Sequence, residues 1–350
     1  MKHILVTGGT GFIGSHICLV LLNNGYDITI IDSLINSSPF AIQRLKEFCK
    51  SGKKNVNTID FKIGDLRDQD FLSSLFETYF KKGFKFDAVL HLAGLKSVEE
   101  STQKPLKYWD YNLVGTINLL KMMEEYRCTN LVFSSSATVY GSKKDNTLID
   151  EYSLINPTNT YGYTKATIER ILEDLSNIKN QKWRIASLRY FNPVGAHYSG
   201  IIGENPLDIP NNIFPIIIKV AAGLIDELKI FGNDWDTPDG SGIRDYVHVM
   251  DLAEGHLISL EKILNNEFKF IKLNLGTAKG TSVLELIKTF EKVNKVKVPY
   301  KFCSRRDGDV AYSVADNSLA KSILNWMPKR DLEEMCRDSW NWYKHNPGGF

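Results

Sequence analysis

The chain has 350 residues, of which 43% are hydrophobic and 24% are charged, proportions that are typical of folded globular domains. The 43 basic residues nearly balance the 41 acidic ones, and the net charge of +2 gives no reason to expect nucleic acid or an anionic membrane as a partner. One large domain or two modest ones are expected, because a single core is hard to extend beyond roughly 250–300 residues.

The cysteines and the apolar stretches of the sequence indicate the cellular compartment of the protein. The five cysteines lie far apart, at positions 18, 49, 128, 303 and 336. Their odd number and spacing argue against a disulfide framework or a zinc site, and a reducing cytosol fits best. The N-terminus has too few apolar residues for a signal peptide, and the most apolar stretch, 213–225, is interrupted by Pro215, Lys219 and Gly223. We therefore expect a cytoplasmic protein.

Short β-rich runs alternate with amphipathic helical stretches through the first half of the chain. Strands are predicted at residues 3–7, 27–32, 56–63, 87–93, 130–136 and 183–190. Helices are predicted at residues 12–24, 68–80, 105–126 and 161–178. This alternation, with strands that are apolar on nearly every residue, predicts an α/β fold in which a doubly wound parallel sheet of the Rossmann type is covered by helices on both faces.

The pattern changes near residue 190, where prolines and glycines cluster and the loops lengthen. Helices predicted at 211–224, 248–264 and 331–344 are interleaved with strands less regularly. We therefore expect a first domain over residues 1–190 and a smaller α/β domain over residues 191–350. The segment around 244–260 is expected to return and pack on the first domain.

A glycine-rich turn follows the first predicted strand, in VTGGTGFIGSH. Its glycines at 8, 11 and 14 permit a tight turn, a close approach by a pyrophosphate and close packing of helix on strand. Asp32 ends the second strand 18 residues after Gly14, near the spacing of an acid that accepts hydrogen bonds from both ribose hydroxyls. A carboxylate there repels a 2′-phosphate, and the following SLINS has no Arg or Lys, so the pattern predicts NAD rather than NADP.

A tyrosine and a lysine stand four residues apart in NPTNTYGYTK. On a helix Tyr161 and Lys165 share a face, whereas Tyr163 and Lys165 point apart. Tyrosine is a poor base near neutral pH unless a cation lowers its pKa. Ser136 ends the fifth strand, where ligands of open α/β sheets bind. The three side chains are therefore catalytic candidates, although Tyr161 and Lys165 alone could also be a surface pair.

Longer stretches of the sequence carry a family resemblance. The glycine fingerprint, FSSSATVYG and YGYTK resemble the extended short-chain dehydrogenase/reductase family. Within it, HLAGLKSVEES, LRYFNPVGAH, FGNDW and GIRDYVHVMDLAEGH are similar to the UDP-glucose 4-epimerases, almost from end to end. The resemblance implies an NAD-dependent isomerase of galactose metabolism that interconverts UDP-glucose and UDP-galactose by transient oxidation at C4, with NAD bound throughout and the second domain binding the nucleotide-sugar.

The resemblance also implies individual roles. Tyr161 would take the proton of the sugar 4-hydroxyl, Lys165 would hold the nicotinamide ribose and lower the Tyr161 pKa, and Ser136 would bind O4. Cofactor contacts are implied for Gly8, Gly11, Phe12, Ile13, Gly14, Asp32, Ser33, Leu34, Ile35, Asn36, Ser37, Asp65, Leu66, Leu92, Ala93, Gly94, Lys96, Asn112, Ser136, Tyr161, Lys165 and Phe191. Substrate contacts are implied for Lys96, Ser136, Tyr161, Asn192, Asn212, Ile213, Phe231, Arg244, Arg305, Arg306, Asp309 and Ser313.

Several alternatives stay open for single residues. Guanidinium groups suit a diphosphate, but Arg244 could instead pair with Asp245 or Asp251. His91 lies in an apolar run and is expected to be a satisfied core histidine. His248 and His256 lie eight residues apart on a helical pattern without a carboxylate cluster, so no metal site is expected.

Three other functions are compatible with parts of the sequence. A nucleotide-sugar 4,6-dehydratase of the same family would need an Asp-Glu pair after the active-site serine, where this chain has Ala137 and Thr138. An epimerase for other UDP-sugars is a second rival, and a non-catalytic NAD-binding regulator is a third. Such a regulator would not need the catalytic serine, tyrosine and lysine together.

Two further expectations come from the resemblance. Epimerases restricted to unacetylated sugars place a bulky tyrosine where this chain has Ser313, so UDP-GlcNAc and UDP-GalNAc are expected to be accepted as well. The helices at 105–126 and 161–178 correspond to those that form a homodimer in this family.

Overall fold

The computed structural model describes residues 2–51, 58–142, 146–206, 212–306 and 309–350, and the chain forms two compact units. Unit 1 comprises Met1–Gly141, Ile155–Arg189 and Glu254–Leu273. Unit 2 comprises Ser142–Leu154, Tyr190–Ala253 and Asn274–Phe350.

Unit 1 is built on a seven-stranded sheet in the order β11-β6-β5-β4-β1-β2-β3. The strands are β1 (His3–Thr7), β2 (Asp27–Asp32), β3 (Ile59–Ile63), β4 (Ala88–His91), β5 (Asn130–Ser136), β6 (Arg184–Tyr190) and β11 (Phe270–Leu275). The pairs β1–β2, β2–β3, β1–β4 and β4–β5 are all parallel. The predicted parallel sheet is therefore confirmed, and its strand order reverses between β1 and β4, where such sheets bind ligands.

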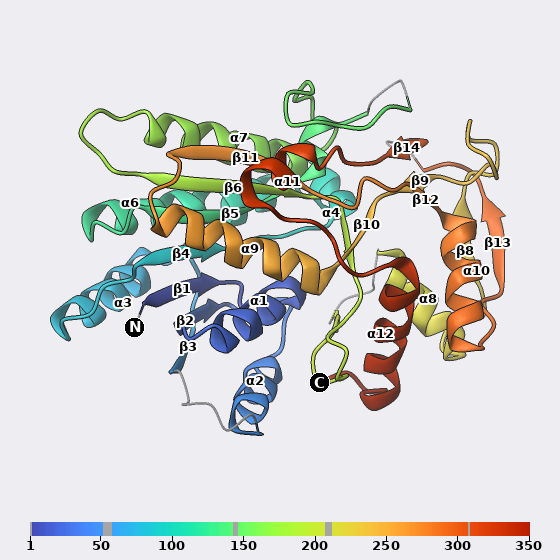
Figure 1. Ribbon diagram of the computed structural model, residues 1–350, viewed down its shortest axis with the longest axis horizontal. Helices are drawn as coiled ribbons and strands as arrows, with labels where there is room; N and C mark the ends of the chain where they lie inside the picture. Colours follow the sequence, from blue (N-terminus) through green and yellow to red (C-terminus); the bar gives the residue numbers. More distant parts are fainter. Residues whose placement is uncertain (1, 52–57, 143–145, 207–211, 307–308) are drawn as a thin grey trace. The chain divides into compact units, whose positions relative to one another are not determined.

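Helices cover both faces of this sheet, with α1 (Phe12–Asn23) and α2 (Phe40–Ser51) on one side in Figure 1. The other side carries α3 (Gln69–Lys81), α6 (Gly115–Glu125) and α7 (Thr160–Ser176), whose apolar side chains join those of the strands in one core. Leu72, Leu119 and Leu172, one from each of these helices, are fully buried there. A short α4 (Val98–Gln103), capped by Ser97, lies between α3 and α6 in the chain, and neither α2 nor α4 was predicted.

The helix predicted over 105–126 is present as one continuous helical run, but a π-helical turn lies within it. The structure has α5 (Pro105–Tyr108), a wider π-helical turn η1 (Trp109–Val114) and then α6. π-Helical turns inside α-helices are often found at functional sites. Here the wide turn carries Asn112, whose side chain binds the loop after β4.

Unit 2 combines three small sheets with helices. Its strands are β7 (Asn192–Val194), β8 (Leu228–Phe231), β9 (Ile243–Arg244), β10 (Tyr246–His248), β12 (Thr281–Ser282), β13 (Tyr300–Cys303) and β14 (Tyr312–Ser313). Its helices are α8 (Ile213–Ala221), α10 (Val283–Asn294), α11 (Ser318–Leu324) and α12 (Leu332–His345), while α9 (Val249–Leu264) starts in unit 2 and continues in unit 1. Phe214, Phe290 and Met335 belong to its core.

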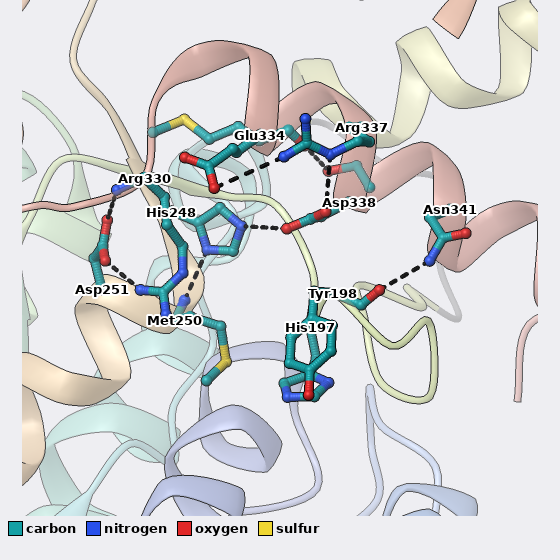
Figure 2. A network of polar contacts seen from close by, with 12 residues as sticks. His197, Tyr198, His248, Met250, Asp251, Arg330, Glu334, Arg337, Asp338 and Asn341 are labelled. Atoms are coloured by element: carbon teal, nitrogen blue, oxygen red, sulfur yellow. Dashed lines mark hydrogen bonds and ion pairs between the residues drawn. The ribbon is translucent and has the colours of Figure 1, made fainter. Parts of the chain in front are cut away.

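A polar network anchors the start of α9 within unit 2 (Figure 2). His248 ends β10 instead of lying within the helix predicted over 248–264. Its Nδ1 accepts from the Met250 N–H at 3.1 Å, so Nε2 carries the proton and donates to Asp338 of α12 at 3.3 Å. Asp251 binds both the side chain and the backbone N–H of Arg330. These contacts are consistent with a structural role for His248.

Candidate active site

The glycine-rich turn between β1 and α1 leaves no space for side chains. Gly8 has φ +72°, and a Cβ there would lie 2.7 Å from the backbone nitrogen of Ala93. A Cβ on Gly14 would lie 2.1 Å from the carbonyl oxygen of Gly8. Gly11 is the N-cap of α1 and brings no side-chain acceptor, so the first-turn N–H groups, which include those of Phe12 and Ile13, suit a pyrophosphate.

The loop after β2 fits a ribose. The Asp32 carboxylate accepts from the Thr10 N–H at 3.1 Å, the Leu34 N–H at 3.0 Å and the Ser37 hydroxyl at 2.9 Å. A carboxylate can accept about four hydrogen bonds, and Asp32 already accepts three. One acceptor position is therefore left for a ribose hydroxyl, whereas the sequence predicts bonds from both ribose hydroxyls. The buried Asn36 Oδ1 has no hydrogen-bond partner among the described residues. A buried acceptor without a partner beside this acid fits a polyhydroxy ligand. Ser33 and Ile35 are exposed in the same loop.

The loop after β3 carries Asp65 and Leu66, near which the adenine is expected. Asp65 accepts two hydrogen bonds from the Arg67 guanidinium, which holds the pKa of that carboxyl below its usual value. The same guanidinium lies 3.5 Å from the centre of the Tyr111 ring and 2.6 Å from Asp110. Leu66 is buried beneath this cluster in the core of unit 1.

His91 organises the loop after β4, as a satisfied core histidine. Thr116 donates to the Asn112 carbonyl, so it accepts from His91 Nε2–H at 2.8 Å. Nδ1 is then the acceptor for the Thr7 hydroxyl at 2.7 Å, and Thr7 in turn accepts from the Ala93 N–H. Both ring nitrogens are used, and burial lowers the pKa of His91 to about 3. The neutral ring thus fixes Ala93 in place beside the glycine turn.

We predict that His91 makes the protein sensitive to acid. Its folded pKa lies below the unfolded value of 6.5, so the unfolded chain binds the extra proton and stability falls as the pH drops from about 6.5 toward 3, by at most about 1.4 kcal/mol per pH unit. Unfolding by urea at pH 7.5 and pH 5 should show a smaller acid loss for His91→Gln than for the wild type. His345→Gln, at an exposed position, is the control. Equal acid losses in His91→Gln and the wild type would contradict the prediction.

Asn112 holds the rest of that loop. Its Oδ1 accepts from the Leu95 N–H at 2.8 Å, and its Nδ2 donates to the Leu95 carbonyl and to Thr164, both at 3.1 Å. Because both amide protons are used, Asn112 positions the loop and offers no donor to a cofactor. Leu92 is half-buried at the start of this loop, and Gly94 and Lys96 are exposed within it.

The three catalytic candidates converge where β5 ends and α7 begins. The Thr138 hydroxyl donates to Ser136 Oγ at 3.0 Å, and Ser136 lies near enough to the Tyr161 hydroxyl to lower its pKa. Lys165 Nζ donates to the Ser134 carbonyl at 2.6 Å and lies 5.8 Å from the centre of the Tyr161 ring. The predicted serine–tyrosine–lysine group is therefore assembled within unit 1.

Burial dominates the electrostatics of this group. It raises the pKa of Tyr161, and the nearby Ser136 opposes that shift. It lowers the pKa of Lys165 to about 8, and the negative charge of Glu169 opposes that shift. The lowering of the Tyr161 pKa by Lys165 stays a prediction, because in this structure the nearby Ser136 is the group that lowers it.

Close packing of α7 places Tyr161 beside Ser136. Asn159 caps the helix by accepting from the Gly162 N–H at 2.9 Å. A Cβ on Gly162 would lie 2.8 Å from the carbonyl oxygen of Thr138, so only glycine allows α7 to approach the turn η2 (Ala137–Tyr140) this closely. Tyr163 points to solvent and is 48% exposed.

Four of the predicted substrate residues form one group in unit 2. Arg244 lies 3.6 Å from Asp309, and Arg306 donates to the same carboxylate at 3.2 Å. The Arg306 guanidinium also lies 4.3 Å from the centre of the Phe231 ring. The alternative in which Arg244 pairs with Asp245 or Asp251 is therefore wrong for this structure.

Arg305 lies outside the group formed by Arg244, Arg306, Asp309 and Phe231. Its Nε donates to Asp234 at 2.8 Å, and its guanidinium lies 3.9 Å from the centre of the Trp235 ring. Of the two neighbouring arginines, Arg306 is therefore the one that lies with Arg244 and Asp309.

The remaining predicted substrate residues lie around β7, α8 and β14 of unit 2. Asn192 starts β7, and Phe191, which is a predicted cofactor residue, is buried just before that strand. Asn212 is exposed at the N-cap of α8 and donates to Glu204 at 3.3 Å, and Ile213 starts that helix. Ser313 of β14 is paired in register with Arg244 of β9.

No metal site is evident in the described part of the chain, where no three or more His, Cys, Asp or Glu side chains lie close enough to hold an ion. The same residues include no helix that is long and apolar enough to cross a bilayer.

Comparison with known proteins places the chain in a family. A family model described as GDP-mannose 4,6 dehydratase matches residues 5–339. The Bacillus subtilis (strain 168) UDP-glucose 4-epimerase is 50% identical over 347 residues, which cover 99% of this chain and 98% of the relative. A Pisum sativum protein named bifunctional UDP-glucose 4-epimerase and UDP-xylose 4-epimerase 1 is 48% identical and covers 100% and 97%. The chain belongs to the UDP-glucose 4-epimerase family of extended short-chain dehydrogenases/reductases.

Solved structures of this epimerase family agree with the assignment. The UDP-glucose 4-epimerase of Stenotrophomonas maltophila, crystallised with NAD and formylated UDP-arabinopyranose, has a TM-score of 0.92 at 44% identity, with 99% of each chain covered. That of Bifidobacterium longum, in complex with NAD+ and UDP, has a TM-score of 0.90 at 43% identity, with 100% of each chain covered.

The dehydratase named by the family model is not supported by the residues after Ser136. The places of the acid pair are taken by Ala137 and Thr138, and Thr138 is engaged in hydrogen bonding to Ser136. A methyl group and a hydroxyl cannot supply the acid and base that elimination of water requires. The catalytic group therefore fits the epimerases of the family.

Sequence reasoning missed one residue of the substrate half. Asp245, fully buried, accepts from the Thr277 N–H at 2.7 Å and hydroxyl at 2.6 Å, the Ala278 N–H at 3.0 Å and the Ala315 N–H at 3.1 Å. Burial raises its pKa to about 6, and these hydrogen bonds oppose the shift. Its own backbone binds Asn192 and Ser313, so Asp245 joins the segments of these two predicted substrate residues to its own, which carries Arg244. An acid inside the apolar run DYVHV was the available signal.

Proposed function

We propose that the protein interconverts UDP-glucose and UDP-galactose by reversible oxidation at C4, with NAD as a resident cofactor. The grouping of Ser136, Tyr161 and Lys165 where β5 ends and α7 begins carries this proposal. It supplies a base and an oxygen-binding hydroxyl at the carboxyl end of the parallel sheet whose strands β1 and β2 carry the nucleotide cradle. Relatives and solved structures named UDP-glucose 4-epimerase, two of them with NAD bound, support it.

The chain's own residues account for proton transfer. Tyr161 takes the proton of the 4-hydroxyl and returns it after the 4-keto sugar has turned over, so one group acts as base and then as acid. Ser136 binds O4, and the Lys165 ammonium favours the ionised tyrosine through its charge. NAD, held by the glycine turn at Gly8, Gly11 and Gly14 and by Asp32, would supply the hydride acceptor for C4.

The nucleotide end of the substrate is proposed to bind in unit 2. Arg244 and Arg306 offer two guanidinium groups to a diphosphate, and at present both contact Asp309, which keeps them together. The Phe231 ring offers a stacking surface for a base. Asn192 and Asn212 supply amides for hydroxyl and carbonyl groups.

An isotope experiment tests this reaction. UDP-glucose deuterated at C4 should give UDP-galactose that keeps the deuterium at C4, because the hydride is removed and returned within one site. Mass spectrometry of the product in ordinary water reads the label. Loss of the deuterium to solvent would contradict the proposed chemistry, and a 4,6-elimination product would favour the dehydratase instead.

We propose that N-acetylated UDP-sugars are substrates too. Ser313, opposite Arg244 in the β9–β14 pair, is small enough to leave room for an N-acetyl group. A Campylobacter jejuni structure described as a UDP-Glc/GlcNAc 4-epimerase is 34% identical, with a TM-score of 0.82.

Substitution at Ser313 should change this specificity. Ser313→Tyr should lower kcat/KM for UDP-GlcNAc by about 10- to 100-fold, because its ring fills the space of an N-acetyl group, and should change UDP-glucose turnover little. Steady-state assays on both sugars measure the ratio. An equal loss on the two substrates would refute the idea.

We also propose a cytoplasmic homodimer. Leu106 of α5, Val114 of η1 and Tyr163 of α7 are 82%, 41% and 48% exposed, and these three elements contact one another. Exposed apolar side chains on adjacent helices suit a partner surface. All five cysteines are free thiols, as expected in a reducing compartment. A monomer mass at micromolar concentration by analytical ultracentrifugation would contradict the dimer.

A further inference from the structure

Two opposite charges are buried behind the catalytic pair in unit 1. Glu169 of α7 and Arg189 of β6 are 4% and 1% exposed. Arg189 donates from one terminal nitrogen to Glu169 Oε2 at 2.6 Å and from Nε to Oε1 at 2.9 Å. Burying two charges is costly, and a buried pair by itself is weak evidence for a role in stability. A role in the active site is the alternative.

The pair connects every element that carries a catalytic residue. Glu169 Oε1 also accepts from the hydroxyls of Ser135 at 2.6 Å and Ser187 at 3.1 Å. The other terminal nitrogen of Arg189 donates to the Tyr140 hydroxyl at 2.7 Å. The network therefore joins α7 to β5, to β6 and to the turn η2.

The spacing of these contacts sets a register. The three consecutive serines 134–136 engage three residues of α7 that lie four apart and thus share one face of the helix. The first binds Lys165 through its carbonyl, the second binds Glu169 through its hydroxyl, and the third lies near the Tyr161 hydroxyl. Two of these contacts belong to the proposed catalytic group, and Glu169 makes the third.

Glu169 is also the acidic group whose charge acts on Lys165. From α7 itself, Tyr161 and Glu169 face this ammonium, and Glu169 raises the Lys165 pKa against the effect of burial. From β4, the neutral His91 faces it, and from β5 the Phe133 ring and the Ser134 carbonyl do so. Arg189 of β6 and Tyr140 of η2 are reached only through Glu169.

We propose that Glu169, held by Arg189, is a positioning residue for the epimerisation: it sets the register of α7 against β5 and supplies the negative charge next to the Lys165 ammonium. This inference rests on the proposed function, because it concerns the same tyrosine and lysine.

The test compares pH–rate profiles. Glu169→Gln should lower kcat about 10- to 100-fold, with KM for UDP-glucose within about twofold of the wild type, because misplacement of catalytic groups affects the chemical step. Its kcat profile should shift to lower pH, since losing the carboxylate lowers the pKa of Lys165. Glu173→Gln, one turn further along α7 in a half-exposed ion pair with Lys272, should match the wild type.

A neutral double variant separates positioning from stability. Glu169→Gln combined with Arg189→Met removes both buried charges, so thermal unfolding should recover relative to Glu169→Gln, while the lowered kcat and the shifted profile should persist. Recovery of the wild-type kcat and profile in the double variant would overturn the proposal, as would a Glu169→Gln profile at the wild-type pH. Inactivity of the wild type itself would instead refute the proposed function.

Discussion

Tyr161→Phe should lower epimerisation about 10²- to 10⁴-fold, the usual contribution of a positioned general acid–base, and leave NAD bound. The ring can keep its place at the start of α7 when the hydroxyl is removed. Only the group that exchanges a proton with the sugar is lost, together with its contact to Ser136. The measurement is kcat for UDP-glucose, with the NAD content of the purified protein determined by mass spectrometry.

Tyr163→Phe is the matched control for this variant. Its hydroxyl lies two residues away on the same helix, but the side chain is 48% exposed and faces solvent. It should keep kcat within about twofold, as for surface substitutions in general. Equal losses in the two variants would show that Tyr161 is not the acid–base.

Gly162→Ala should lower kcat about 100-fold, although alanine is the better helix former. The new Cβ would lie 2.8 Å from the Thr138 carbonyl oxygen and 3.0 Å from Pro157 Cβ, so α7 must move away from η2. That movement separates Tyr161 from Ser136 and costs about 1–3 kcal/mol of stability through overpacking. Steady-state kinetics and urea unfolding measure the two effects.

Gly348→Ala is the control for added volume. A Cβ at that position meets no atom within 4 Å and should change neither kcat nor stability. A Gly162→Ala variant with the wild-type kcat would show that the close approach of α7 to η2 is unnecessary for catalysis.

The first half of the fold could be predicted because the local apolar pattern of each strand agrees with its burial in the parallel sheet. The runs at 3–7, 27–32 and 130–136 became strands with those bounds, since buried parallel strands are apolar on nearly every residue. The π-helical turn within residues 105–126 was missed because six residues are too few to disturb the apolar periodicity of the whole stretch. The short strands β9, β12 and β14 were missed because two-residue strands have no recognisable pattern.

The catalytic residues could be predicted because they follow a fixed spacing at strand ends. Their supports could not, since they depend on contacts between distant segments. Glu169 and Arg189 are 20 positions apart and looked like ordinary charged residues of a helix and a strand. Gly162 looked like a spacer between two tyrosines. The choice between Arg305 and Arg306 also depended on the fold, which directs Arg305 toward Asp234 and Trp235.

Turnover without added cofactor distinguishes a resident NAD from a dissociating one. Purified protein, incubated with UDP-glucose and no added NAD, should produce UDP-galactose until the two sugars reach equilibrium, because a resident cofactor is regenerated in every turnover. Liquid chromatography of the two UDP-hexoses gives the result. Protein that contains NAD and binds UDP-glucose but forms no UDP-galactose would contradict the account.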